Sequence, residues 1–331
     1  MQHGHPGFIP SILVLGAGEL GLSVVRALAT WPGPGAARIS VLLRPQAAAP
    51  AAASKRALLE ELRALNVATV YADIAGADVR QLAALFQPFD TVVNCTGFVG
   101  GPGTQRKLTQ AALQAGVARY VPWQFGVDYD QIAPGSGGGI FDEQIAVRAM
   151  LRAQQRTAWT IVSTGMFTSF LFEPAFGVVD LARRTVHALG SWDTRVTVTA
   201  PEDIGTLTAH MLFTQPAGAN HIFFTAGETI TYARLAERVQ KALQAPVQRT
   251  VWTVQQLEQD LARQTDDAMR RYRLAFAKER GVAWDQASTY NARHSIATQD
   301  VAAYLQGRQA LRAPFAPGHG ETIRSSNLER T

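Results

Sequence analysis

The stretch Ser11 to Gly21, SILVLGAGELG, determines the fold expected for the first half of the chain. Its first five residues are mostly aliphatic or β-branched and predict a short buried strand. Three glycines then form a G-x-G-x-x-G pattern that opens a predicted helix, which is the context in which this pattern binds a dinucleotide. The glycines permit a tight turn, approach of a pyrophosphate to the backbone, and close packing of the helix on the strand. We therefore predict a dinucleotide site at Gly16, Gly18, Glu19, Leu20 and Gly21; the alternative is a glycine-rich turn without a ligand.

Strands and helices alternate from this stretch outward. The apolar strands lack a polar face, which is typical of strands buried on both sides of a parallel sheet. We predict a Rossmann-type doubly wound α/β domain over 11–165, a flexible tail over 1–10, and a smaller mixed α/β substrate lobe over 166–331, with about 196–214 packing back on the first domain. The predicted strands are 11–15, 38–43, 67–71, 91–95, 118–121, 159–163 and 195–199. The predicted helices are 19–30, 55–65, 78–86, 104–115, 141–154, 201–213, 231–243 and 266–280, and 133–139 is a predicted lid or turn.

Composition narrows the class of protein. The chain has 331 residues, of which 47% are hydrophobic and 17% charged, as in a folded globular enzyme. Its net charge of +5 is scattered, so nucleic-acid binding is disfavoured, and no apolar run reaches the roughly 20 residues that span a bilayer. A single cysteine, Cys95, excludes an internal disulfide and fits the cytoplasm. We expect no metal, since the histidines lack ligand spacing, and leave a homodimer open.

The end of the second predicted strand indicates which dinucleotide is bound. Enzymes that use NAD place an acidic residue about 20 residues after the glycine motif to bind the ribose 2′-hydroxyl. Here no acidic residue lies between Glu19 and Glu60, and the strand ends in Arg44. A guanidinium at this position pairs with a 2′-phosphate and stacks on adenine, and Lys55 adds charge. These residues predict NADP(H) in preference to NAD(H); the alternative is a solvated arginine.

Two further strand ends are expected to contact the same cofactor. Asp73 and Ile74 follow the third strand and are placed to line the adenine, although Asp73 is equally suited to cap a helix. Thr96, Gly97 and Phe98 follow the fourth strand and would lie along the pyrophosphate and ribose. Carboxyl ends of parallel strands meet at one edge of the sheet, so these side chains are predicted to share one crevice.

At this point the chain resembles the NmrA-like, isoflavone-reductase-like branch of the atypical short-chain dehydrogenases. The residues that carry the resemblance are the glycine motif, Leu43-Arg44, Asp73-Ile74, Gln105 to Pro122, Phe125-Gly126-Val127-Asp128, Phe141 to Phe172, and Pro201 to Gly205. Within this branch the chain is similar to bacterial members called aromatic alcohol reductases. The resemblance implies reduction of phenylpropanoid-type compounds with NADPH, with a lysine as base or proton relay.

The chain departs from this pattern at the catalytic position. Gln144 stands where the family lysine is expected, and Trp123-Gln124 replaces a Ser-Glu pair before Phe125. A neutral amide holds a nicotinamide or substrate by hydrogen bonds but does not transfer a proton near neutral pH. We predict Tyr129 as the proton donor or carbonyl-orienting group, with Gln144 positioning. The alternative is that Tyr129 is a packed loop residue.

Four apolar residues are expected to bind the substrate at the carboxyl ends of the strands. They are suited to stacking and sulfur–aromatic contact with a flat aromatic ring, and are equally compatible with packing between the lobes. These residues are Phe125, which would also touch the cofactor, Met166, Phe167 and Phe170.

Two functions remain consistent with these residues. The first is an NADPH-dependent reductase of a small aromatic carbonyl or enone compound. The second is a non-catalytic NADP(H)-binding redox sensor with a protein partner, which the missing lysine favours. Fold alone does not separate them.

Overall fold

The computed structural model describes residues 9–34, 36–45, 53–97, 100–215, 219–278 and 280–310. Its central feature is a sheet of seven parallel strands, which confirms the predicted α/β class. These strands are β1 (Ser11–Leu15), β2 (Arg38–Leu43), β3 (Ala68–Tyr71), β4 (Thr91–Asn94), β5 (Arg119–Val121), β6 (Ala158–Ser163) and β11 (His221–Phe224). The helices of this part are α1 (Glu19–Ala29), α2 (Ala53–Ala64), α3 (Val79–Phe86), α4 (Thr104–Ala115), α6 (Asp142–Arg152) and α7 (Pro201–Thr214).

The strand order of the sheet locates the site. The order is β11-β6-β5-β4-β1-β2-β3, so the chain reverses its direction of growth between β1 and β4. In doubly wound sheets ligands bind outside the carboxyl ends of the strands at such a reversal. The glycine stretch follows β1 and Thr96 follows β4, and both therefore lie at this point.

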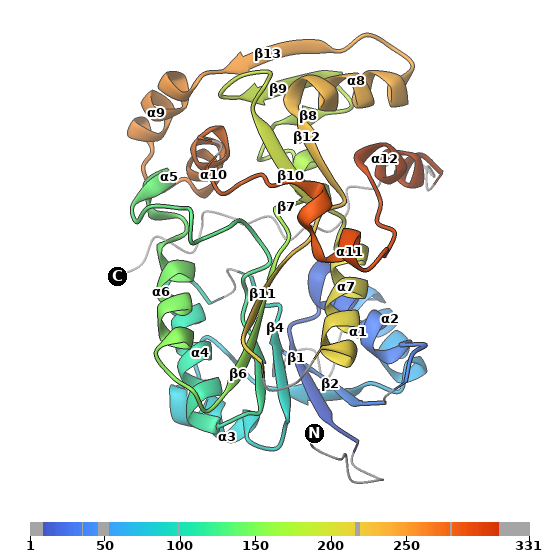
Figure 1. Ribbon diagram of the computed structural model, residues 1–331, viewed down its shortest axis with the longest axis vertical. Coiled ribbons are helices and arrows are strands. Elements are labelled where there is room, and N and C mark those ends of the chain that lie inside the picture. The colour runs from blue at the N-terminus through green and yellow to red at the C-terminus, as the bar shows by residue number, and fades with distance from the viewer. Residues whose placement is uncertain are drawn as a thin grey trace.

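Helices cover both faces of the sheet (Figure 1). Helices α3, α4 and α6 lie on one face and α1, α2 and α7 on the other. Each face has its own buried cluster: Leu13, Phe86 and Leu108 belong to the first, and Val24 and Leu207 to the second. Two-sided burial explains why the strands are apolar without alternation.

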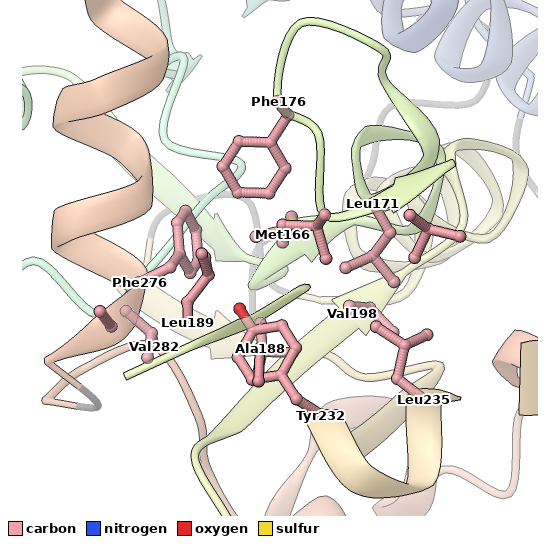
Figure 2. Packing of buried hydrophobic residues seen from close by; sticks show 14 of the residues in the cluster. Met166, Leu171, Phe176, Ala188, Leu189, Val198, Tyr232, Leu235, Phe276 and Val282 are labelled. Carbon is pink, nitrogen blue, oxygen red and sulfur yellow. The ribbon is translucent and has the colours of Figure 1, made fainter. Parts of the chain in front are cut away.

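The second part of the chain forms a lobe above the carboxyl edge of the sheet (Figure 1). It contains two three-stranded sheets, ordered β12-β10-β7 and β13-β9-β8. The strands are β7 (Met166–Phe167), β8 (Val179–Asp180), β9 (Thr185–Leu189), β10 (Arg195–Thr199), β12 (Glu228–Thr231) and β13 (Gln248–Trp252), and the helical segments are α5 (Ser136–Gly139), η2 (Thr168–Phe172), α8 (Tyr232–Leu243), α9 (Val254–Arg263), α10 (Ala268–Ala277), η3 (Gln286–Ser288), α11 (Tyr290–Arg293) and α12 (Val301–Ala310). Figure 2 shows the core of this lobe, where Met166, Leu171, Phe176, Val198 and Phe276 point toward one another.

The two lobes are interleaved along the chain. Helix α7 packs on α1, so closely that a side chain at Gly205 would meet the Ser23 carbonyl oxygen at 2.3 Å. Strand β11 pairs in parallel with β6 at the edge of the large sheet, a strand that the sequence analysis did not predict. After Met166 the chain therefore returns to the first lobe through α7 and β11.

The structure also describes the segment predicted as a lid or turn and parts of the two ends of the chain. The glycine-rich segment 133–139 includes α5, and a side chain at Gly137 would lie 2.7 Å from Cβ of Ala275 in α10, so this segment is packed on the second lobe. Most of the predicted tail at 1–10 lies outside the described residues, as do residues 311–331 at the end of the predicted substrate lobe. No helix among the described residues is long and apolar enough to cross a membrane.

Candidate active site

The glycine loop after β1 leaves open space at the N-terminus of α1. Gly16 has a φ of +92°, which favours glycine, and a side chain at Gly21 would meet the Gly16 carbonyl oxygen at 2.1 Å. The turn and the packing of α1 therefore require glycine at both positions whether or not a ligand is bound. A Cβ atom at Gly18 would have no contact within 4 Å. Gly18 is also the N-cap of α1 and supplies no side-chain cap to the helix amides. Open space beside uncapped amides at a helix N-terminus fits an anionic group such as a pyrophosphate.

The carboxylate of Glu19 is turned away from the glycine loop toward the second lobe. Its Oε2 accepts a hydrogen bond of 3.0 Å from Oγ of Ser169, which lies in η2. Leu20, the next residue of the motif, is 5% exposed and packs in the core under α1. Within the motif, Gly18 is therefore the position that faces open space.

Basic residues lie at the end of β2 and at the start of α2. Arg44 directly follows β2 and is exposed, and Lys55 and Arg56 are exposed on the first turn of α2. The amide of Ala72 donates a 3.1 Å hydrogen bond to the carbonyl of Leu43, which brings the turn after β3 alongside Arg44. Arg44 and the turn that begins at Asp73 thus lie at the same edge of the sheet.

Asp73 stabilises its own turn and does not cap the next helix. Its Oδ1 accepts a 3.0 Å hydrogen bond from the amide of Ala75, while Asp78 caps α3 in a capping box with Gln81. The helix-cap alternative for Asp73 is therefore wrong, because the cap comes five residues later. Ile74, 8% exposed, is packed in the core.

A buried polar network fixes the loop after β4. Asn94 Nδ2 donates to Gln105 Oε1 at 2.8 Å and to the Tyr120 hydroxyl at 3.1 Å, and Asn94 Oδ1 accepts from the Thr96 hydroxyl at 2.8 Å. Gln105 Nε2 in turn donates to Thr96 Oγ1 and to the Gly97 carbonyl. Thr96 and Gly97 are therefore held at the reversal point of the sheet, whereas Phe98 lies outside the described residues.

The loop after β5 is joined to the end of β6 through Gly126. Its carbonyl accepts hydrogen bonds of 2.9 and 3.0 Å from the amides of Thr164 and Gly165. Phe125, one residue earlier, is 5% exposed and packs in the core of the first lobe. The predicted substrate residue Met166 follows immediately after Gly165, so the two strand ends lie side by side.

Gln144 lies buried in the first turn of α6. It is 2% exposed, and its Oε1 has no hydrogen-bond partner among the described residues. The preceding residue, Glu143, accepts hydrogen bonds from the amides of Gly103 and Arg106 at the start of α4, which places this end of α6 beside the loop that follows β4. A buried amide oxygen without a partner costs free energy unless a ligand supplies a donor, so this oxygen fits a ligand-binding role.

Tyr129 is buried in a cluster of aromatic rings between the lobes. Its ring centroid lies 5.5 Å from that of Phe141, and Phe141 contacts Tyr272 of α10 at 5.9 Å. The Tyr129 hydroxyl oxygen would be 2.5 Å from a side chain at Gly126, so it lies against the backbone that joins β5 and β6. Burial raises the pKa of the Tyr129 phenol, with the nearby positive charge of Arg148 acting in the opposite direction. The phenol is therefore a hydrogen-bond donor over the neutral pH range.

The other predicted substrate residues differ in exposure. Met166 is 3% exposed and lies in the core of the second lobe (Figure 2). Phe167 and Phe170 are half-buried, and the Phe170 ring stacks on Phe176 at 4.5 Å between centroids. Phe167 and Phe170 therefore retain more surface for a ligand than Met166.

Four residues of this region were missed by the sequence analysis as functional candidates: Gln124, Arg148, Ser163 and Tyr272. The spacing of four residues between Gln144 and Arg148 puts both on one face of a helix, and this signal was available. The hydrogen bond between Gln124 and the backbone of Gln144 joins residues twenty positions apart, so it depends on tertiary structure and could not be predicted from local sequence. Within the described residues, no group of three His, Cys, Asp or Glu side chains could hold a metal ion.

The parallel sheet, its reversal point and the glycine loop define a Rossmann-type protein of the doubly wound class. The chain belongs to the NmrA-like family, whose model matches residues 10–295. It is 42% identical over 297 residues to an "NmrA-like family domain-containing oxidoreductase" from Gibberella moniliformis, a match that covers 89% of this chain and 97% of that protein.

Solved structures of low sequence identity share the fold. An isoflavone reductase superposes with a TM-score of 0.73 at 21% identity, covering 91% of this chain and all of that one. A binary complex of leucoanthocyanidin reductase with NADPH from Vitis vinifera has a TM-score of 0.73 at 18% identity, covering 90% of this chain and 98% of that one.

Proposed function

We propose that this protein is an NADPH-dependent reductase of small aromatic carbonyl or enone compounds. The observation that carries the proposal is a pair of features at the carboxyl edge of the sheet: the N-terminus of α1 has open space and no side-chain cap at Gly18, and the buried Oε1 of Gln144 has no partner among the described residues. The first feature suits a pyrophosphate and the second a ligand hydrogen-bond donor. The relative is named as an oxidoreductase and the two solved structures as reductases, which agrees with this proposal.

The cofactor would lie along the carboxyl ends of the first four strands. Arg44 would pair with the 2′-phosphate, with charge from Lys55, because a guanidinium binds phosphate through two parallel hydrogen bonds. The remaining proposed cofactor residues line the same edge: Gly16, Gly18, Glu19, Leu20, Gly21, Asp73, Ile74, Thr96, Gly97, Phe98, Phe125 and Gln144. Of these, Leu20 and Ile74 have largely buried apolar side chains, so they would support the backbone of the site from the core.

The reaction requires a hydride, which NADPH supplies when bound. The protein would contribute orientation and a hydrogen bond to the substrate oxygen. Tyr129 would donate that hydrogen bond from its phenol and give the proton to the oxygen as the hydride reaches the carbon, regaining it from water. The amide of Gln144 would hold the nicotinamide or the substrate without exchanging a proton. Phe125, Met166, Phe167 and Phe170 would form the apolar surroundings of an aromatic ring, which also exclude water.

Cofactor choice is tested by isothermal titration calorimetry with NADPH, NADP⁺, NADH and NAD⁺ on the wild type and on Arg44→Ala. Loss of a charge-assisted pair of hydrogen bonds, about 1.5–3 kcal/mol, should weaken NADPH binding roughly tenfold to a hundredfold and leave NADH binding little changed. Arg38→Ala is the matched control, because Arg38 is exposed at the opposite end of the same strand. Equal losses for both cofactors would remove Arg44 from the 2′-phosphate.

The reductase activity is tested by NADPH oxidation against a panel of aromatic aldehydes, ketones and enones. Turnover on any of them supports the proposal. Tight NADPH binding without turnover, together with a clear difference between NADPH and NADP⁺ affinity, would instead support the redox sensor, a function that the neutral Gln144 at the catalytic position favours.

A further inference from the structure

A buried guanidinium lies one helical turn beyond Gln144. Arg148 is on α6, four residues later, and is 2% exposed. Its Nε donates to Gln124 Oε1 at 2.8 Å, and one terminal nitrogen donates to Ser163 Oγ at 3.3 Å. The guanidinium thus joins the loop after β5, helix α6 and the last residue of β6.

The charge of Arg148 is balanced by carboxylates on the same loop. The guanidinium lies 2.8 Å from Asp130 Oδ2 and 3.3 Å from Asp128 Oδ1. Hydrogen bonding from Arg152, together with the charge of Arg148, lowers the pKa of Asp130, so its carboxylate is ionised at neutral pH. A buried cation with such partners is held in one geometry, since release of any partner would leave a charge uncompensated.

Gln124 transmits this geometry to Gln144. Its Nε2 donates a 2.7 Å hydrogen bond to the backbone carbonyl of Gln144, while its Oε1 accepts from Arg148. An arginine only donates and a carbonyl only accepts, so the Gln124 amide has a single orientation that satisfies both neighbours. The first turn of α6 is therefore anchored at Gln144 through an amide whose direction Arg148 determines.

Arg148 also contacts the second candidate catalytic group. Its Cζ lies over the Tyr129 ring, 5.2 Å from the centroid, a cation–π contact in a buried setting. Tyr129 and Gln144 come from different segments, and Arg148 is the residue that contacts the first directly and the second through Gln124.

We propose that Arg148 is a positioning residue. It holds Tyr129 directly and Gln144 through Gln124, and so fixes the two groups relative to each other at the reaction site. The inference rests on the proposed function for the roles of Gln144 and Tyr129, but the contacts that fix their geometry are independent of it. Arg148 touches no reacting atom in this scheme, so its effect is on turnover through the placement of others.

Two variants separate this role from folding. Arg148→Lys retains the charge that Asp130 requires but lacks the planar fork that reaches Gln124 and Ser163 together. Gln124→Glu retains a partner for Arg148 but has no donor for the Gln144 carbonyl. Arg152→Lys is the control, because Arg152 also pairs with Asp130, at 2.7 Å, yet its side chain is 47% exposed on the next turn.

Each variant is measured for thermal melting, for kcat and KM, and by NMR of protein labelled with ¹⁵N-glutamine. The Gln144 side-chain amide resonance is assigned from its loss in Gln144→Leu. We expect Arg148→Lys and Gln124→Glu to lower kcat about tenfold to a hundredfold with KM for NADPH changed less than about threefold. Both should shift or broaden the Gln144 resonance in protein that still melts cooperatively, and Arg152→Lys should do neither.

The NMR measurement distinguishes failure of this inference from failure of the proposed function. Wild type that turns over no substrate, with the resonance moved in both variants and not in the control, would reject the reductase and support the positioning of Gln144. An unmoved Gln144 resonance in folded Arg148→Lys would overturn the inference whatever the turnover. An equal loss of kcat in Arg152→Lys would also overturn it.

Discussion

At the scale of single residues, Gln144 is the position where this chain departs most from its resemblance. A lysine buried to the same extent would have its pKa depressed by desolvation and could accept a proton, whereas a glutamine has no titrating group. Its buried Oε1, which has no hydrogen-bond partner among the described residues, is nevertheless available to accept a hydrogen bond from a ligand. The chemistry proposed here therefore requires Gln144 to orient a ligand and assigns hydrogen-bond donation to the substrate oxygen to Tyr129.

Tyr129→Phe tests that assignment. The substitution keeps the ring against Phe141 and Arg148 and removes only the hydroxyl. We expect kcat to fall on the order of tenfold to a thousandfold, in the range of a lost oriented donor or general acid, with NADPH affinity by calorimetry unchanged. Because burial raises the pKa of the phenol, wild-type kcat should show no alkaline decline from this group below pH 9. Unchanged kcat in the variant would exclude the hydroxyl from the reaction.

The site could be predicted from sequence only where its chemistry is local. The glycine motif and Arg44 are read from neighbouring positions because the turn, the helix start and the strand end are consecutive in the chain. Gln124 and Arg148 were missed because their importance arises from a hydrogen bond across twenty residues and from burial. The roles predicted for Tyr129 and Gln144 stay predictions until turnover is measured.

At the scale of elements, the turn after β3 is held by a lysine from α4. Nζ of Lys107 donates to the carbonyls of Ile74, Ala75 and Ala77 at 2.7, 3.0 and 2.9 Å. The turn also contains Asp73, which is proposed to line the adenine. A single cation with three carbonyl acceptors therefore fixes the backbone at one end of the proposed cofactor site.

Lys107→Met should loosen this turn while retaining an extended apolar side chain. We expect a loss of about 1–3 kcal/mol in unfolding free energy, the contribution of hydrogen bonds to a charged group, and a several-fold weaker NADPH affinity. Chemical denaturation and calorimetry measure the two effects. Lys241→Met, on the exposed face of α8, is the matched control and should change neither. Full NADPH affinity in Lys107→Met would dissociate this turn from the cofactor site.

The elements themselves were predicted best where periodicity is strong. The bounds of β1, β2, β10 and α4 match the sequence-based predictions, because each is an uninterrupted apolar or amphipathic run. Strand β11, residues His221–Phe224, was missed because it is four residues long and becomes a strand only by pairing with β6. The sheet of β13, β9 and β8 was missed for a different reason, because it lies in a lobe whose sequence has no repeating pattern of strands and helices.

At the scale of the whole molecule, an aromatic and histidine cluster joins late segments of the chain to the first lobe. Nδ1 of His210, on α7, is 2.8 Å from the Tyr290 hydroxyl of α11, and the His210 ring meets Trp31 edge-on at 5.7 Å between centroids. His294 lies 5.7 Å from His210. Since Trp31 follows the C-terminal end of α1, this cluster lies at the end of the helix opposite the glycine loop, and its state should alter stability rather than cofactor binding.

The cluster predicts an acid-dependent loss of stability. Burial, and next the charge of His294, lower the pKa of His210 in the folded protein. The unfolded chain, with a histidine pKa of about 6.5, therefore binds this proton more readily than the folded chain. The stabilisation is fully present above about pH 6.5 and is lost as the pH falls through this value toward the lower folded pKa. Between pH 7.5 and 5.5, the melting temperature of the wild type should drop more than that of His210→Gln, which has no titrating ring. Thermal scans of both proteins in matched buffers measure this difference, and parallel pH profiles for the two proteins would show that His210 does not carry the effect.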